Sequence, residues 1–138
     1  MPFITLHHTA SSDSALSARL ATELTALTQR ILRKDPQRTS VLVRTVPAAE
    51  WYIAGTSMAD RAAPVFRLEV TVTAETNTQD EKRRFQREAF ALLNDLLGGV
   101  HPHSNVHVID CRATAYGYGG ITQEEHLMKQ TLTGIDTE

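Results

Sequence analysis

The most constraining feature of the sequence is that its second half repeats the pattern of its first half. The stretch SVLVRTVPAAEWYIAG, residues 40–55, aligns without a gap with NVHVIDCRATAYGYGG, residues 105–120. Val41 falls on Val106, an offset of 106 − 41 = 65 residues that holds through the whole stretch. Self-similarity of this kind marks a repeated supersecondary unit, so each half is predicted to form the same unit.

Each half also contains one segment with helical periodicity. Large apolar residues recur at spacings of three and four in residues 14–34 and again in residues 78–97. This spacing places the apolar side chains on one face of a helix, where a sheet can cover them. Pro36 ends the first helix, because proline disfavours helical backbone in the residue before it, and Gly98 ends the second.

The segments around the two helices have the pattern of strands. In residues 66–72 apolar side chains alternate with Arg67, Glu69 and Thr71, which predicts a strand with one apolar and one polar face. A crossover helix makes the strands on its two sides parallel. The sequence therefore predicts an α/β (α+β) fold of two β-α-β repeats, with a four-stranded mixed sheet and two helices on one face.

The predicted organisation is one domain, residues 1–138, because this length suffices for a single core. Repeat one covers about 2–55, repeat two about 64–120, and 121–138 is a polar tail with a weak helical pattern at 123–129. The short aromatic stretches WYIAG and YGYGG are predicted to be ribbons at the edge of the fold. Exposed aromatic edges favour pairing with another subunit, so we expect an oligomer.

Composition excludes several classes of protein. A formal net charge of -2 argues against a nucleic-acid-binding surface, which needs an excess of Lys and Arg. No stretch has the 18 or more apolar residues expected of a membrane-spanning helix, and no signal-peptide pattern opens the chain, so we expect no membrane partner. The single cysteine, Cys111, cannot form an internal disulfide, and we therefore expect a cytoplasmic protein.

Several of these features together resemble the tautomerase superfamily, which includes 4-oxalocrotonate tautomerase and macrophage migration inhibitory factor. They are the Met-Pro start directly on the strand pattern FITLHH, the two β-α-β units, and the closing YGYGG. The segment KDPQRTSVLVRTVP, residues 34–47, is similar to the corresponding run of the migration-inhibitory-factor branch. The resemblance extends to about Gly120. It implies a homotrimer that carries out cofactor-independent proton transfer in a small acidic substrate.

Pro2 is the residue to which this resemblance assigns catalysis. Removal of Met1 would turn the Pro2 nitrogen into a secondary amine, and a terminal amine has a reference pKa of about 7.7–8.0. An apolar pocket would lower that pKa further, because it destabilises the charged form. The neutral amine could then act as a general base for keto-enol proton transfer in a 2-keto or enol acid. It could instead attack a carbonyl to form an iminium.

The resemblance and the strand pattern also suggest residues that bind the substrate. The loops in which family members carry arginines read TASSDS and TAETNT here and contain none, so other cations would have to bind the substrate carboxylate. Lys34 resembles the pocket lysine of the migration-inhibitory-factor branch, and Tyr116 resembles the aromatic pocket wall of 4-oxalocrotonate tautomerase. The candidate substrate-binding residues are Lys34, Arg44, His107, Tyr116 and Trp51.

Other functions stay open at this point. A cofactor-free hydratase or dehalogenase acting on an unsaturated acid would use the same fold, and so would a trimeric binding protein without catalysis. His101, His103 and His107 match no standard metal-ligand spacing, so no metal site is predicted. Cys111 lies in an apolar strand pattern, which is typical of a structural cysteine and not of a nucleophile.

Overall fold

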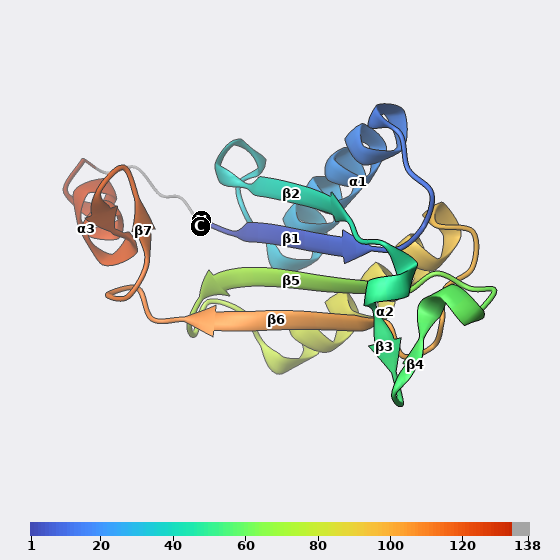
Figure 1. The fold of residues 1–138 in the computed structure, drawn as a ribbon. Helices are drawn as coiled ribbons and strands as arrows, with labels where there is room; N and C mark the ends of the chain where they lie inside the picture. Colours follow the sequence, from blue (N-terminus) through green and yellow to red (C-terminus); the bar gives the residue numbers. More distant parts are fainter. Residues whose placement is uncertain (134–138) are drawn as a thin grey trace.

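Four strands form one mixed sheet, as predicted, in the order β2-β1-β5-β6 (Figure 1). The structure is a computed structural model that describes residues 1–133. Strand β1 (Phe3–His8) is parallel to β2 (Ser40–Thr45), and β5 (Phe66–Thr73) is parallel to β6 (Asn105–Cys111). The two parallel pairs meet where β1 lies antiparallel to β5. The starts of β1 and β2 and the ends of β5 and β6 therefore lie at the same end of the sheet.

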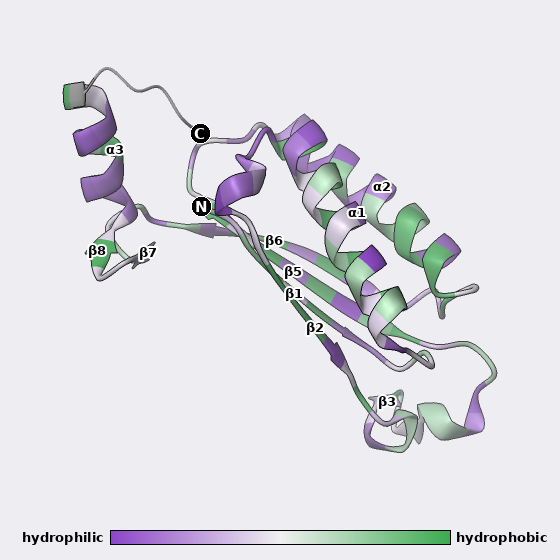
Figure 2. Cartoon of the chain, turned by 90° about the horizontal axis from the view of Figure 1, so that it is seen from above, coloured by the Kyte–Doolittle hydropathy of each residue, from purple (hydrophilic) through white to green (hydrophobic). Residues whose placement is uncertain are grey.

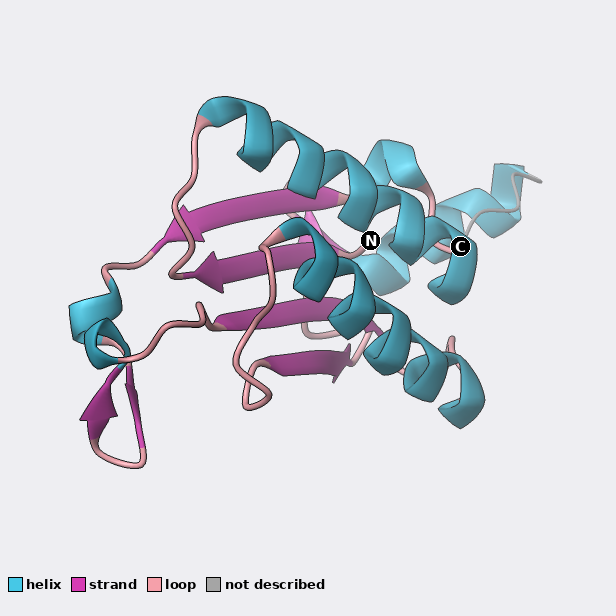
Figure 3. Ribbon diagram, turned by 90° about the vertical axis from the view of Figure 1, so that its right-hand side faces the viewer, coloured by secondary structure: helices cyan, strands magenta, loops and turns pink. Residues whose placement is uncertain are grey.

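Helices α1 (Ser14–Leu32) and α2 (Gln79–Leu96) cover one face of this sheet (Figure 3). Both end within two residues of their predicted bounds. The core lies between the two layers and is built from alternate residues of the central strands and from the apolar stripe of each helix. Its fully buried side chains include Ile4, Leu6, Leu20, Leu24, Phe66, Leu68, Val70, Phe85 and Leu93.

The two aromatic stretches form separate ribbons and do not extend the four-stranded sheet. One ribbon pairs β3 (Tyr52–Ile53) with β4 (Thr56–Ser57), and the other pairs β7 (Gly117–Tyr118) with β8 (Ile121–Thr122). The offset of 65 residues found in the sequence relates β3 to β7 and β4 to β8. Short 3-10 helices lie at Pro36–Arg38 (η1), Ala48–Glu50 (η2) and Met58–Asp60 (η3).

The repeat is broken after the second ribbon. Where the first half has the single turn η3, the second half continues into the helix α3 (Gln123–Thr133). The helical pattern seen in the polar tail is thus confirmed and extends further than predicted; residues 134–138 of the tail lie outside the described residues. The second ribbon and α3 stand beyond the end of β6 (Figures 1 and 2). No helix within residues 1–133 is long and apolar enough to cross a membrane.

The face of the sheet opposite α1 and α2 is left open in the single chain (Figure 2). It includes the polar residues predicted on β5, of which Arg67 and Glu69 form an ion pair of 2.6 Å. It also carries three apolar side chains, Phe3, Leu42 and Ile109, which are 36–40% exposed. A face of mixed polarity with exposed apolar side chains is typical of a surface that another chain covers.

The start of α2 gives a testable prediction about acid stability. Thr78 and Glu81 form a capping box, and Arg33 donates from Nε to Glu81 Oε2 at 2.7 Å. The bonds from Arg33 and from the Thr78 backbone lower the pKa of Glu81 from 4.5 to about 2. A pKa lowered on folding stabilises the protein above the unfolded pKa, and this contribution is lost as pH falls from about 4.5 towards 2.

Glu81→Gln should therefore lower the melting temperature at neutral pH and have little effect near pH 2. Asp80→Asn is a matched control, because the Asp80 side chain is 91% exposed and lies in the same turn. Thermal unfolding followed by circular dichroism between pH 2 and 7 measures the difference. If Glu81→Gln lowered the melting temperature by the same amount at every pH from 2 to 7, the pH-dependent contribution could not be assigned to Glu81.

Candidate active site

Pro2 lies at the start of β1 and is buried between the two neighbouring strands. Its carbonyl oxygen accepts a hydrogen bond from the backbone N–H of Ser40, the first residue of β2, at 3.2 Å. On the other side, the next backbone N–H, that of Phe3, donates to Thr71 Oγ1 of β5 at 3.1 Å. A chain end would ordinarily fray, but here bonds to both neighbouring strands hold the residue in place.

A cavity of about 470 Å³ opens at this end of the sheet. Met1 and Phe3 line it from the two sides of Pro2, and its other walls come from η1, from the start of β2 and from the second ribbon. With Met1 in place the Pro2 nitrogen is a tertiary amide, which carries no proton and is not basic. The residues that line the cavity are Met1, Phe3, Gln37, Arg38, Thr39, Ser40, Gly117 and Tyr118.

Arg38 is the cation in the wall of this cavity, and the sequence analysis did not select it. It is the last residue of η1, a turn that is fixed by the Asp35 side chain, whose Oδ1 accepts from the Gln37 N–H at 2.9 Å. The Nε atom of Arg38 lies 3.8 Å from Asp35 Oδ2, which is too long for a hydrogen bond. The sequence could have indicated Arg38 by its position just before β2. Strands β1 and β2 are parallel and begin side by side, so residues just before β2 lie close to Pro2, just before β1.

Lys34 lies at the same end of the sheet, where α1 has ended and the chain turns back towards β2. It is only 3% exposed, although lysine is rarely buried without a partner. Its Nζ donates to Thr76 Oγ1, in the loop between β5 and α2, at 2.8 Å. Lys34 thus contributes a positive charge near the Pro2 end of the sheet and also joins the two repeats.

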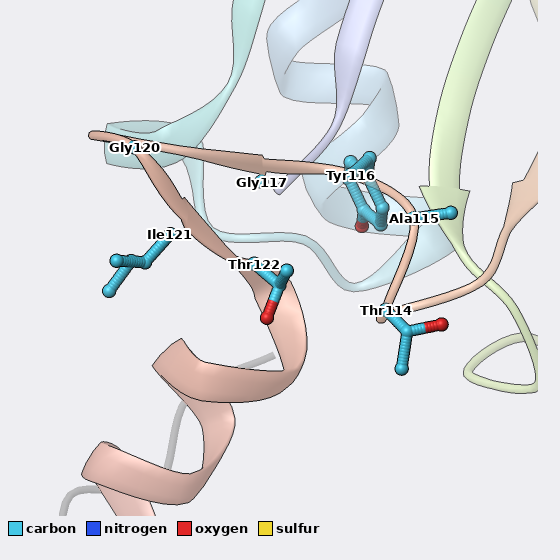
Figure 4. A pocket seen from close by; sticks show the side chains of 7 residues that line it. All are labelled: Thr114, Ala115, Tyr116, Gly117, Gly120, Ile121 and Thr122. Carbon is cyan, nitrogen blue, oxygen red and sulfur yellow. The ribbon is translucent and has the colours of Figure 1, made fainter.

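Tyr116 belongs to the second repeat and also lies at the Pro2 end of the sheet. Its hydroxyl forms a short hydrogen bond with that of Thr73, the last residue of β5. It also lines a second cavity, of about 310 Å³, formed by the segment 114–117 and by Ile121 and Thr122 of the ribbon (Figure 4). Gly117 lines both cavities, so the two are neighbours across the second ribbon.

Gly117 is expected to tolerate no side chain. A Cβ atom at this position would lie 1.9 Å from the backbone oxygen of Ile121, inside the hairpin itself. Gly117→Ala should therefore separate β7 from β8, lower the melting temperature and alter the cavity beside Pro2. Thermal unfolding and nuclear magnetic resonance spectra of the ribbon residues would measure both effects. Thr114→Ala, an exposed change in the preceding loop, should leave both unchanged.

Three of the predicted site residues lie away from Pro2 within one chain. Arg44 and His107 are on the open face of the sheet, where His107 pairs in register with Glu69. Arg44 is near the far end of β2, and its register partner His7 is almost the last residue of β1. Trp51 precedes the first ribbon, which Figure 2 places at the end of the sheet opposite the N-terminus. Of the predicted residues, the single chain brings Lys34 and Tyr116 to the Pro2 end.

The histidines and the cysteine form no further cluster of this kind. Within residues 1–133 no group of three or more His, Cys, Asp or Glu side chains is placed to hold a metal ion. The rings of His101 and His103 lie 6.4 Å apart, centroid to centroid, and His107 is on the sheet. Cys111 is half-buried at the end of β6.

Comparison with known proteins agrees with this architecture. Residues 2–61, which include Pro2, β1, α1 and β2, match the Tautomerase family, described as tautomerase enzymes. No curated protein sequence matches the chain. Among solved structures, a native fused 4-OT has a TM-score of 0.75 at 24% sequence identity and covers 89% of this chain and 97% of its own.

Two further structures extend the likeness. A fused 4-OT that forms an asymmetric trimer has a TM-score of 0.79 at 17% identity, over 90% of this chain and 98% of its own. The macrophage migration inhibitory factor-like protein of Entamoeba histolytica has a TM-score of 0.72 at 12% identity, over 88% of this chain and 97% of its own. Identities this low establish the fold, and the family match covers the first β-α-β unit. The first β-α-β unit of the chain therefore matches the Tautomerase family, and the whole chain has the fold of the fused 4-OT structures, with two β-α-β units.

Proposed function

We propose that this protein is a cofactor-independent tautomerase in which Pro2, once Met1 is removed, is the general base. The observation that carries the proposal is that Met1 itself lines the cavity beside the buried Pro2. Removal of Met1 would create the new amine next to the space that Met1 now borders. The strand bonds to Ser40 and Thr71 would keep the amine in a fixed position, as proton transfer requires.

The proposed reaction is keto-enol proton transfer in a small 2-keto or enol acid. The neutral Pro2 amine takes a proton from the carbon next to the carbonyl or from the enol oxygen. The resulting ammonium group returns the proton to the other position, so that no atom is gained or lost. Burial of Pro2 supports this role, because desolvation would disfavour the charged form of the amine that removal of Met1 creates.

Arg38 is proposed to bind the carboxylate of the substrate, with Lys34 and Tyr116 close to the same end of the sheet. A guanidinium group in a cavity wall matches a carboxylate in shape and charge. This role takes the place of the loop arginines of other family members, which the sequence lacks. Arg44, His107 and Trp51 could reach the substrate only if a second subunit brought them to the Pro2 end.

We propose that the protein assembles as a homotrimer. Four of the similar structures are described as fused 4-OT trimers, two asymmetric and two symmetric. In this chain, the open sheet face with Phe3, Leu42 and Ile109 and the ribbon that stands beyond β6 are suited to contact other subunits. Sedimentation equilibrium measures the assembly state, and a monomer at micromolar concentration would contradict the proposal.

The first test is chemical. The similar protein Pt0534, 14% identical with a TM-score of 0.78, is described as inactivated by 2-oxo-3-pentynoate. Intact mass should show a protein one methionine residue lighter than the full sequence. Treatment with 2-oxo-3-pentynoate should then add one reagent mass at Pro2: the nitrogen bonds to the alkyne, and the N–H proton passes to the neighbouring carbon. Retained Met1, or labelling elsewhere, would contradict the proposed base.

The second test separates the alternative functions. Phenylenolpyruvate and 2-hydroxymuconate test for tautomerase activity, and halogenated or acetylenic acrylates test for the hydratase or dehalogenase. We expect turnover of phenylenolpyruvate and 2-hydroxymuconate and no turnover of the acrylates. Turnover of the acrylates alone would favour the hydratase or dehalogenase. No turnover of either by protein without Met1 would favour a non-catalytic binding protein.

A further inference from the structure

A second polar cavity lies at the end of the sheet opposite Pro2, and the proposed function does not use it. Its volume is about 270 Å³, and it is formed by the loop after β1, by η2 and η3, and by the segment that leads into β5. Since β1 has six residues at about 3.3 Å each, this cavity lies about 20 Å from Pro2 within one chain. The wall residues that matter here are Thr9, Ser11, Met58, Arg61 and Pro64.

Arg61 is the cation of this cavity, and no carboxylate in residues 1–133 forms an ion pair with it. Its Nη2 donates to the backbone oxygen of Ile53 at 3.2 Å, and its Nη1 lies 3.3 Å from Nε2 of His101. Its Nε is buried and has no hydrogen-bond partner among the described residues. A buried donor without an acceptor is costly, which suggests that a ligand supplies the acceptor.

The contact between Arg61 and His101, which lies outside the cavity wall, leaves a second guanidinium nitrogen without an acceptor. The Nδ1 atom of His101 accepts a hydrogen bond from the backbone N–H of His103 at 3.0 Å. A ring nitrogen that accepts a bond carries no proton, so the proton of the neutral ring is on Nε2. Arginine can only donate. Two donors therefore face each other at 3.3 Å, and neither satisfies the other. An anion beside Arg61 in the cavity would supply the acceptor that the guanidinium lacks.

The residues of this cavity cannot act as the Pro2 amine is proposed to act. Pro64 lines the cavity, but its nitrogen is an internal amide and cannot become a base. The cavity can therefore bind a ligand without carrying out the proposed Pro2 chemistry.

We propose that this cavity is a binding site for a short-chain monocarboxylate, whose carboxylate is bound by Arg61. One guanidinium supplies a single positive charge, which matches a monoanion better than a doubly charged phosphate. The side chains of the alanines, Met58, Pro64 and Leu97 can contact a short carbon chain, and the largely polar remainder of the wall suits the carboxylate. The Ser11 hydroxyl in the same wall can donate a further bond.

Butyrate is a suitable probe, because it has no ketone and cannot undergo the proposed Pro2 reaction. Titration of the full chain with butyrate, followed by proton–nitrogen correlation spectra, should shift the Arg61 Nε–H signal and the amide signals of Ala10 and Ala62. Arg61→Met should weaken this binding at least tenfold. Arg38→Met, which changes only the cavity at the Pro2 end, should leave these shifts unchanged.

A second variant keeps the test valid if Arg61→Met unfolds the protein. Ala62→Leu retains Arg61 and fills part of the cavity, so it should also abolish the butyrate shifts while the melting temperature stays near that of the wild type. Butyrate shifts confined to residues 37–40, or binding equal to wild type in Arg61→Met, would overturn the site. Shifts produced by inorganic phosphate but not by butyrate would overturn the choice of a monocarboxylate.

Discussion

Blocking the Pro2 amine is expected to lower kcat/KM for enol-keto conversion by about 10²- to 10⁴-fold, the range that a positioned general base contributes. The most direct way to remove the Pro2 amine is to insert one alanine between Met1 and Pro2. After Met1 is removed, the free amine belongs to the alanine and the Pro2 nitrogen remains an amide. Assays with phenylenolpyruvate and 2-hydroxymuconate measure the loss.

Two controls separate loss of the base from loss of the fold. The inserted variant should keep the far-ultraviolet circular dichroism spectrum and melting temperature of the wild type, because β1 retains its bonds to Ser40 and Thr71. Pro2→Ala should keep a terminal amine, though a primary one, and is expected to be less impaired than the inserted variant. Wild-type activity in the inserted variant would eliminate Pro2 as the base.

Replacement of Arg38 is expected to produce the second largest effect. Loss of a hydrogen bond to a charged group costs about 1.5–3 kcal/mol, which corresponds to a decrease of about 10- to 150-fold in kcat/KM. Arg38→Met should show this decrease mainly as an increase in KM, because the proposed role is to bind the carboxylate. Arg38→Lys should recover part of the loss, since it restores the charge but not the two-pronged geometry.

Arg87→Met is the matched control for this variant, because Arg87 is exposed on α2 and the change in net charge is the same. Its kcat/KM should stay within about twofold of the wild type. Equal decreases in Arg38→Met and Arg87→Met would point to a long-range effect of net charge. An unchanged KM in Arg38→Met would remove Arg38 from the substrate site and leave Lys34 as the cation at that end.

The repeated pattern in the sequence predicted most of the fold. Apolar spacing of three and four located both long helices, and alternation located the strands, because each element must bury one face. The offset of 65 residues applies to the paired strands of both ribbons, which supports the duplication beyond the stretch first aligned. The crossover within each repeat predicted the parallel direction of its two strands, whereas the order of the four strands came from the structure.

The candidate site was less predictable. Alternation along a strand places Arg44 and His107 on one face of the sheet, but it does not tell whether that face meets the Pro2 end. Arg38 was missed because it lies in a short turn with no periodicity, and only the pairing of β1 with β2 brings it beside Met1 and Phe3. Arg61 was also missed, because it directly follows the short turn η3, which has no periodicity in the sequence.

The sequence by itself determined the repeats, the positions of the helices and strands, and the proline that begins the first strand. These depend on local periodicity and on the backbone limits of proline and glycine, which are properties of neighbouring residues. Only the tertiary structure decided which cations share a cavity with Pro2 and which lie at the opposite end. That choice depends on the register between strands and on loop geometry, and it joins residues far apart in the chain, such as Phe3 with Arg38 and Tyr118.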